Sequence, residues 1–257
     1  MEQKNIKKIL LLFDVDGTIA YSGKKIDHDI QKILESLSVE NFELGIVGGG
    51  TFEKIQKQVG TSLFTHIFSE CGCQYFKKKE NEFHSIYSKN IMEHSSFPEM
   101  KVLIQKCLHF IGSQIKCEIS GNFIDRRKGL YYISLVGMQA NDKERQNFII
   151  YDNLYHYREN LIEYLKINLH PDIDVKIGGS TGITILPKTW NKSQIMDHID
   201  HTNYKKIFYF GDKYEENGND FELIHYALDS LIGVPVKTVD DTVAYLKEHF
   251  KPDSNCL

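Results

Sequence analysis

The sequence predicts an α/β fold in which a doubly wound parallel sheet is interrupted by an inserted α+β segment. From Ile9 to Gly72, apolar runs as long as buried strands alternate with helical patterns. From residue 86 to residue 186 the pattern changes to helices beside alternating strands, and after Pro187 the first pattern returns. We therefore expect one domain formed by 1–85 and 187–257, split by an inserted domain formed by 86–186.

Three strands and two helices are expected before the insert. The apolar run Ile9–Phe13 has the length of a strand that is buried on both faces. Helical spacing of apolar residues predicts the first helix, and an N-cap at Thr51 with a stop at Gly60 predicts the second. The expected strands are 9–13, 44–47 and 64–68, and the expected helices are 26–37 and 51–60.

The insert is expected to be an α+β module, because its helices are gathered beside strands that alternate. Its expected helices are 86–93, 100–111 and 142–168, the last with a break near Asp152, and its expected strands are 117–135 and 175–186. The returning segment is expected to resume the first sheet. Its expected helices are 190–199, 221–227 and 240–250, and its expected strands are 206–210 and 230–236.

The composition is that of an ordinary globular protein. Of the 257 residues, 41% are hydrophobic and 26% are charged, and the formal net charge is −4. This charge gives no indication of a nucleic-acid or membrane surface, and no segment approaches the length needed to span a bilayer. The five cysteines lack the usual spacing of metal ligands, and the charged first residues are not typical of a signal peptide. We expect a cytoplasmic protein with reduced thiols.

Two carboxylates follow the first strand. Asp14 and Asp16 lie at its carboxyl end, where open α/β sheets place their ligands. Alternation along an extended chain points both side chains to the same side. Two ionised carboxylates so close together repel each other unless a cation lies between them. A site made of oxygen ligands is the kind that Mg²⁺ prefers. An isolated Asp-x-Asp is more often an acidic turn. However, the run Leu-Leu-Leu-Phe-Asp-Val-Asp-Gly-Thr resembles the first motif of the haloacid dehalogenase (HAD) superfamily of phosphotransferases.

The two carboxylates are expected to have different catalytic roles. Asp14 is expected to attack phosphorus and form an aspartyl phosphate. Asp16 is expected to be the general acid and base for the sugar oxygen. After a later apolar strand, Asp212 and Asp220 are expected to complete the metal site with Asp14 and Asp16. Alone this second cluster could be a polar turn before a helix, but its spacing resembles the last HAD motif.

A lysine and a glycine turn are further candidates for phosphate binding. Lys192 is expected to neutralise charge in the transition state, although an isolated lysine is usually a solvated surface residue. Lys213 competes for this role and is expected to be a solvated turn residue. Gly49 and Gly50 open a helix, so their N–H groups can hold a phosphate. Thr51 beside them is either a phosphate ligand or simply the N-cap.

Five segments, in order along nearly the whole chain, resemble the eukaryotic phosphomannomutases. They are Phe-Asp-Val-Asp-Gly-Thr, residues 45–58, residues 121–125, residues 186–192, and residues 210–213 with 218–220. The resemblance implies a HAD core with a C2b-type cap. It also implies Mg²⁺-dependent interconversion of mannose 6-phosphate and mannose 1-phosphate, primed by a hexose 1,6-bisphosphate that phosphorylates Asp14. Such enzymes are cytoplasmic homodimers joined through the cap, and they serve GDP-mannose synthesis.

The chain departs from the family pattern at positions that would hold the substrate. Each lost charge-assisted contact with phosphate removes about 1.5–3 kcal/mol, because neither Ser nor Met can replace the planar fork of arginine. The departures are Gly23, Ser120 and Met138 at arginine positions, and Gly182 and Thr184 at Ser and Asp positions.

Arg127 is retained at a family position, and with Gly179 it is expected to bind substrate. Arg126, Arg127 and Lys128 could also be a solvated turn. Two alternatives to the mutase therefore stay open: a Mg²⁺-dependent sugar-phosphate phosphatase with altered cap specificity, and a catalytically weak binding homologue.

Overall fold

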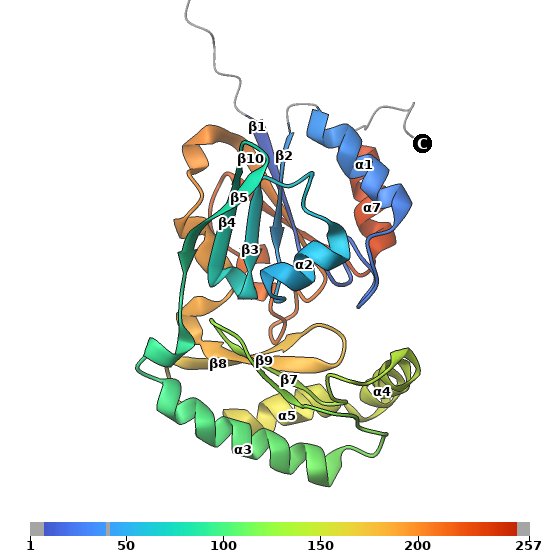
Figure 1. Cartoon of the computed structure of the whole chain (residues 1–257), viewed down its shortest axis with the longest axis vertical. Helices are drawn as coiled ribbons and strands as arrows, with labels where there is room; N and C mark the ends of the chain where they lie inside the picture. Colours follow the sequence, from blue (N-terminus) through green and yellow to red (C-terminus); the bar gives the residue numbers. More distant parts are fainter. Residues whose placement is uncertain (1–7, 40–41, 251–257) are drawn as a thin grey trace, which may run out of the picture.

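The computed structural model describes residues 8–39 and 42–250, which form two sheets and the helices that cover them (Figure 1). The strands of the main sheet are β1 (Lys8–Phe13), β2 (Phe42–Val47), β3 (His66–Ser69), β4 (Gln74–Lys79), β5 (Glu82–Ser88), β10 (Tyr204–Gly211) and β11 (Leu231–Pro235). They lie in the order β11-β10-β1-β2-β3-β4-β5. The second sheet contains β6 (Ile124–Arg126), β7 (Tyr131–Ser134), β8 (Ile173–Gly178) and β9 (Gly182–Pro187) in the order β6-β7-β9-β8.

The main sheet is buried on both faces, as the apolar sequence of β1 predicts. Leu11 and Phe13 face a cluster that includes α1 (His28–Val39), α2 (Phe52–Val59) and α7 (Val239–His249). Leu10 and Leu12 face the opposite cluster, to which α6 (Phe221–Ile224) and the short 3₁₀ helix Lys192–Asp197 contribute. The strands from β11 to β3 pair in parallel. This arrangement confirms the predicted α/β fold.

The second sheet is antiparallel and has its own apolar core. Its helices are α3 (Phe97–Gln114), α4 (Asp142–Tyr155) and α5 (Tyr157–Lys166). Figure 1 shows the sheet between the main body and helices α3 and α5, so one of its faces packs on helices and the other faces the main sheet. Ile133, Ile183 and Ile185 from the strands pack with Phe148 and Leu161 from the helices. No helix in residues 8–39 and 42–250 is both long and apolar enough to cross a membrane.

The predicted helix over 86–93 is wrong. The main sheet continues through the β4–β5 hairpin to Ser88, and only a short 3₁₀ turn, Ile91–Glu93, follows. Glu80 and Asn81 between the strands both have positive φ, 48° and 68°, as a tight two-residue hairpin turn requires. The residues of this segment fit either a helix or a strand, and the turn contains no glycine, so the hairpin had little signal in the sequence.

Other elements also differ from the sequence prediction, and the expected strand 117–135 is two short strands, β6 and β7. The expected strand 175–186 is a hairpin, in which β8 and β9 are joined at Gly179, with φ +62°. The expected break near Asp152 lies at His156, which has φ 54° between α4 and α5. The expected helix 190–199 is replaced by 3₁₀ turns. These differences affect local geometry but not the order of the elements.

The second sheet is tied to the main body near the carboxyl end of β10. The Ile177 amide on β8 donates a hydrogen bond of 2.7 Å to the Asn217 carbonyl in the loop after β10. Lys176 beside it forms an ion pair of 2.6 Å with Glu222 on α6 and also donates to the Glu216 carbonyl. On another side of the molecule, Lys24 contacts Asp142 at the start of α4. The two sheets are therefore joined by contacts at separate points.

Candidate active site

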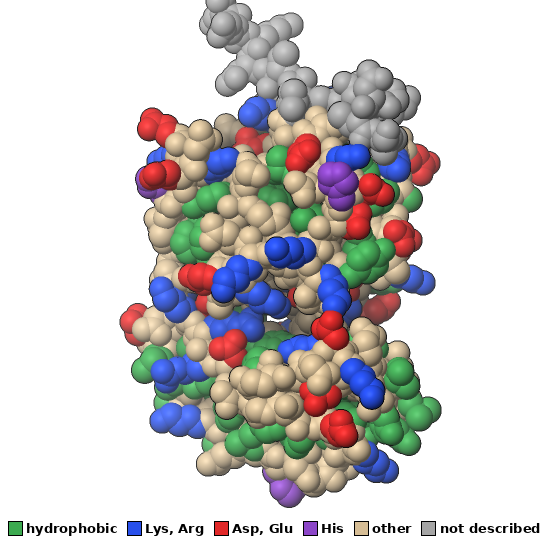
Figure 2. Space-filling model, turned by 45° about the vertical axis from the view of Figure 1, so that its right-hand side comes forward, with side chains coloured by type: hydrophobic (Ala, Val, Ile, Leu, Met, Phe, Trp, Pro, Cys, Tyr) green, Lys and Arg blue, Asp and Glu red, His purple; other side chains and the backbone are tan. Residues whose placement is uncertain are grey.

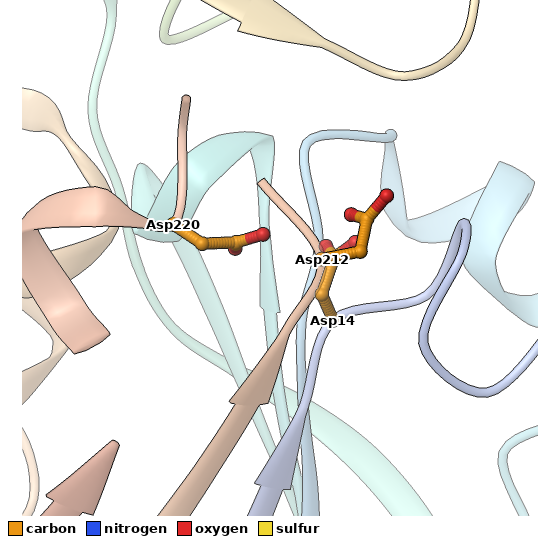
Figure 3. Close-up of side chains that lie close together, drawn as sticks. All are labelled: Asp14, Asp212 and Asp220. Atoms are coloured by element: carbon orange, nitrogen blue, oxygen red, sulfur yellow. The ribbon is translucent and has the colours of Figure 1, made fainter. Parts of the chain in front are cut away.

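Three carboxylates meet at the carboxyl ends of β1 and β10 (Figure 3). These strands are neighbours with Phe13 opposite Phe210, so the residues that follow them, Asp14 and Asp212, come together. Asp220 reaches the same point from the loop before α6. One oxygen of each of the three carboxylates lies within 4.8 Å of the others. The predicted meeting of Asp14, Asp212 and Asp220 at one edge of the sheet is therefore what the structure shows.

The loop after β10 holds Asp220 in place. One oxygen of Asp220 accepts a hydrogen bond of 2.9 Å from the Lys213 amide, and the Asp220 amide donates to the Lys213 carbonyl at 3.1 Å. Gly211 is needed beneath it, because a Cβ at residue 211 would lie 2.6 Å from Asp220 Cγ. These contacts fix the position of the Asp220 carboxylate at the end of strand β10.

Lys192 lies among the carboxylates and is fully buried. Its Nζ is 2.5 Å from Asp14 Oδ1 and 2.6 Å from Asp220 Oδ1, and it donates to the Tyr209 hydroxyl at 3.3 Å. Lys213, the competing lysine, contacts Asp212 and is partly exposed. The structure thus places Lys192 at the expected position beside Asp14.

Burial determines the electrostatics of this cluster. It raises the pKa of Asp14 to about 8, against the opposing effect of Lys192, and it also raises the pKa of Asp212. Burial alone would lower the pKa of Lys192, but Asp14 and Asp220 outweigh it and raise that pKa. A divalent cation would offset the repulsion between these carboxylates, and their oxygen atoms lie close enough together to bind one, so the three residues fit Mg²⁺.

Asp16 is held apart from the three clustered carboxylates. One of its oxygens accepts hydrogen bonds from Gln58 Nε2 at 2.6 Å and from the Gly23 amide at 3.0 Å, and the other lies 3.4 Å from Lys54 Nζ. Burial would raise the pKa of Asp16, but Lys54 and these hydrogen bonds lower it. The expected metal-ligand role of the Asp16 carboxylate is not supported by this geometry, because its oxygens are bound elsewhere.

A cavity between the two sheets contains most of the expected site residues. Asp14, Asp16, Gly49, Gly50, Arg127 and Gly179 all line it. Figure 2 shows lysine and arginine side chains gathered where the upper and lower halves of the molecule meet. Thr51 does not line this cavity. Its hydroxyl accepts a hydrogen bond from the Lys54 amide, so it is the N-cap of α2.

Among the lining residues that the sequence analysis did not identify as site residues are Lys54, Gln58 and Tyr132. Lys54 and Gln58 are four residues apart on α2, so they lie on one face of the helix. This spacing was the feature of the sequence that could have identified them as neighbours in the site. Tyr132 is opposite Thr184 in the register of β7 and β9, a pairing that no sequence pattern revealed.

The family positions that differ in this chain are spread over the site. Gly23 bonds to Asp16 through its amide, and Thr184 lines the cavity. Ser120 and Met138 lie outside the cavity lining. The Ser120 amide donates to the Val136 carbonyl, and the Met138 carbonyl accepts from Arg145. Gly182 lies beneath the ring of Tyr132.

Gly17 supports Asp212 from the turn after β1. It has φ +87°, and a Cβ at this residue would overlap the Asp212 carboxyl group. We expect Gly17→Ala to destabilise the protein by about 2 kcal/mol and to weaken Mg²⁺ binding at least tenfold, because both the backbone and a metal ligand are displaced. Thermal unfolding and calorimetric Mg²⁺ titration measure the two effects.

Gly60→Ala is the matched control for the Gly17 variant. Gly60 also has positive φ, +66°, but nothing lies within 4 Å of an added Cβ. The Gly60→Ala protein should be less stable than the wild type but should bind Mg²⁺ with the same affinity. Equal Mg²⁺ affinity in the two variants would show that Gly17 does not support the ligand.

Comparison with known proteins gives one consistent family. A family model described as eukaryotic phosphomannomutase matches residues 30–252. A phosphomannomutase of Babesia bovis is 32% identical, with 93% of this chain and 96% of that protein covered. One of Galdieria sulphuraria is 31% identical, with 94% of each covered.

Solved structures share the fold at lower identity. An IMP-bound Plasmodium falciparum IMP-nucleotidase superposes with a TM-score of 0.65 at 18% identity, covering 93% of this chain and 67% of that one. The C-terminal domain of a C. albicans trehalose-6-phosphate phosphatase superposes with a TM-score of 0.54 at 17% identity, covering 80% of this chain and 70% of that one. These similarities concern the arrangement of the elements.

Proposed function

Since the chain belongs to the eukaryotic phosphomannomutase family, we propose that it interconverts mannose 6-phosphate and mannose 1-phosphate and serves GDP-mannose synthesis. The observation that carries this proposal is the buried group of Asp14, Asp212, Asp220 and Lys192 at the edge of a cavity. One carboxylate is available as nucleophile, and the others can hold a cation. In this proposal the segments 1–85 and 187–257 form the catalytic domain and 86–186 is the inserted cap, except that strand β5 extends the catalytic domain to Ser88.

Asp14 is the phosphoryl acceptor. A carboxylate oxygen of Asp14 forms a bond to phosphorus while the bond from phosphorus to the donor's sugar oxygen breaks. Lys192, in contact with Asp14, offsets negative charge that builds up during the transfer. Mg²⁺, held by Asp14, Asp212 and Asp220, would supply further charge neutralisation when bound.

Asp16 moves the proton. It removes a proton from the sugar hydroxyl that takes the phosphoryl group from Asp14, and it returns that proton to the sugar oxygen that leaves when Asp14 next accepts a phosphoryl group. Its bonds to Gln58 and Gly23 orient the carboxyl group toward the cavity. The amides of Gly49 and Gly50 are placed to bind phosphate oxygens, as in other glycine turns before helices. A hexose 1,6-bisphosphate is the activator that first phosphorylates Asp14.

One assay tests the function. The protein is incubated with Mg²⁺ and mannose 1-phosphate, with and without a hexose 1,6-bisphosphate, and both mannose 6-phosphate and free phosphate are measured. Formation of mannose 6-phosphate that depends on the activator is the expected result. Free phosphate alone would indicate a hydrolase, and neither product from a folded protein would indicate a binding homologue.

We propose that the protein forms a homodimer and that it acts in the cytoplasm. Ile150 and Leu154, one turn apart on α4, are 65% and 66% exposed, and the next residue on the helix, Tyr155, is also exposed. Figure 2 shows hydrophobic side chains along the right-hand edge of the lower half. Light scattering should give a dimer for the wild type and a monomer for Ile150→Glu combined with Leu154→Glu. A dimeric double variant would place the contact elsewhere.

A further inference from the structure

The glycine turn of the site, residues 48–50, is held by all three of its carbonyl groups. The first and the third carbonyl accept hydrogen bonds of 3.0 and 2.9 Å from the amides of Cys71 and Glu70. The second, that of Gly49, accepts one of 2.6 Å from the guanidinium of Arg127, in the hairpin that joins β6 and β7. The turn is therefore fixed both by the main body and by the inserted segment.

These bonds also orient the N–H groups of the turn. In a trans peptide the carbonyl of one residue and the N–H group of the next lie in one plane and point in opposite directions. Bonds to the carbonyls of Gly48 and Gly49 therefore direct the N–H groups of Gly49 and Gly50 away from the residues that hold the turn. Neither N–H group has a hydrogen-bond partner within residues 8–39 and 42–250, and both glycines line the cavity. Both groups are available to a phosphoryl group there.

Glu70 contacts both the turn and the inserted segment. Its amide bonds to Gly50, and its buried carboxylate accepts a hydrogen bond of 2.7 Å from the Gly129 amide at the tip of the β6–β7 hairpin. A bond of 2.9 Å from the Arg127 amide to the Leu130 carbonyl closes this tip, so the carboxylate that holds Gly129 also holds the residues that carry the arginine. Glu70 has φ 51°, a left-handed conformation that residues other than glycine rarely adopt.

Other contacts keep the hairpin tip near the main body. The Ile91 amide donates a hydrogen bond of 2.5 Å to the Lys128 carbonyl. The tip packs so closely that a Cβ at Gly129 would lie 2.1 Å from Cys73 Cβ. Loss of the Glu70 carboxylate should therefore shift the hairpin and its arginine without detaching them.

We propose that Glu70 is a positioning residue for phosphoryl transfer. Its carboxylate docks the β6–β7 hairpin, and the docked Arg127 and the Glu70 amide together align the glycine turn on the phosphoryl group that passes to Asp14. The inference rests on one step of the proposed function, the transfer to Asp14. It gives the inserted segment a role in orienting groups of the main body.

The test measures phosphorylation of Asp14 by acetyl phosphate with Mg²⁺, using rapid quenching and mass spectrometry. In this step an Asp14 oxygen bonds to phosphorus and acetate leaves, so neither a sugar nor a second phosphate takes part. For Glu70→Leu we expect the maximal rate to fall about ten- to a hundredfold, with little change in the half-saturating concentration, because the aligned amides act mainly in the transition state. Glu70→Gln should stay within about threefold of the wild type, since its side-chain oxygen can still accept from Gly129.

Arg127→Met tests the same link from the side of the hairpin. Acetyl phosphate has no second phosphate for the arginine to bind, so a slower rate with this donor reports on the turn. We expect a loss similar to that of Glu70→Leu. The double variant should be little slower than either single variant, because both changes act on the Gly49 carbonyl.

Glu43→Gln controls for the loss of a mostly buried carboxylate. Glu43 lies near the start of β2, whereas the glycine turn follows the end of that strand, and it accepts a hydrogen bond of 3.0 Å from the Tyr204 hydroxyl. This variant should have a lower melting temperature than the wild type and an unchanged rate of phosphorylation. A purely structural role of Glu70 would give the same result in Glu70→Leu.

The inference and the proposed function fail in different ways. A folded Glu70→Leu or Arg127→Met protein that is phosphorylated at the wild-type rate would overturn the inference, and so would a Glu70→Gln protein as slow as Glu70→Leu. A wild type that acetyl phosphate phosphorylates, but that forms no mannose 6-phosphate from mannose 1-phosphate, would overturn the proposed function and leave the role of Glu70 in place.

Discussion

Replacing Asp14 by Asn is expected to abolish the interconversion of mannose phosphates, with turnover falling at least about a thousandfold. The amide nitrogen or oxygen of Asn cannot replace the carboxylate as nucleophile. The variant also loses one of the three clustered carboxylates. Steady-state rates with mannose 1-phosphate and activator measure the loss, and mass spectrometry after rapid quenching shows whether the chain still gains a phosphoryl group.

The fold should survive this change. Asn is close to Asp in size, and it removes one negative charge from a buried group in which Lys192 keeps its bond to Asp220. Thermal unfolding in Mg²⁺-free buffer should therefore give a melting temperature no lower than that of the wild type. Asp229→Asn, at an exposed carboxylate far along the chain, is the control for turnover. A phosphorylated and active Asp14→Asn protein would assign the acceptor to another residue.

Replacing Lys192 by Met is expected to reduce both stability and activity. Met has nearly the same length but no charge, so Asp14 and Asp220 lose the cation that contacts both of them. Breaking a buried ion pair from one side costs about 3–5 kcal/mol, which corresponds to a fall of roughly 10 °C in melting temperature for a chain of this size. Turnover should fall by about a hundred- to a thousandfold, because charge in the transition state is less well neutralised.

The effect of Mg²⁺ on the melting temperature distinguishes the loss of a positive charge from a packing defect in the Lys192→Met protein. Added Mg²⁺ should raise the melting temperature of Lys192→Met more than that of the wild type, because the cation offsets a repulsion that the lysine no longer offsets. Lys205→Met, at an exposed position, should behave as the wild type in every measurement. An Lys192→Met protein with wild-type stability and turnover would mean that the buried lysine takes no part in the site.

The sequence predicted the core of this site well, because that part depends on strands buried on both faces. The apolar runs before Asp14 and Asp212 fix which strands are central, and parallel neighbours necessarily end at the same edge. The position of Lys192 followed from its resemblance to a family motif, since burial of a lysine could not be deduced from its neighbours in the sequence. The positions of side chains at the strand ends were therefore predictable.

The cap half was less predictable, because its geometry depends on pairing between distant strands. Tyr132 faces the cavity only because β7 pairs with β9 in a register that places Thr184 opposite it. Asp16 was expected among the metal ligands from alternation alone. The structure instead directs its carboxylate to Gln58 on α2, a contact between residues 42 positions apart. Local patterns contain no information about such partners.

The hydrogen bond between Ile177 and Asn217 is one of the contacts that link the inserted sheet to the main body. Asn217 precedes Asp220 by three residues in the loop after β10, so a rotation of the inserted sheet must either move this loop or break the bond. A rotation that displaced this loop would also displace Asp220, so such a rotation and the binding of a cation at Asp220 would be thermodynamically linked, each changing the other by the same free energy. A chain built in this way would hold its cation most tightly while a sugar is enclosed, and would let it exchange most readily between turnovers.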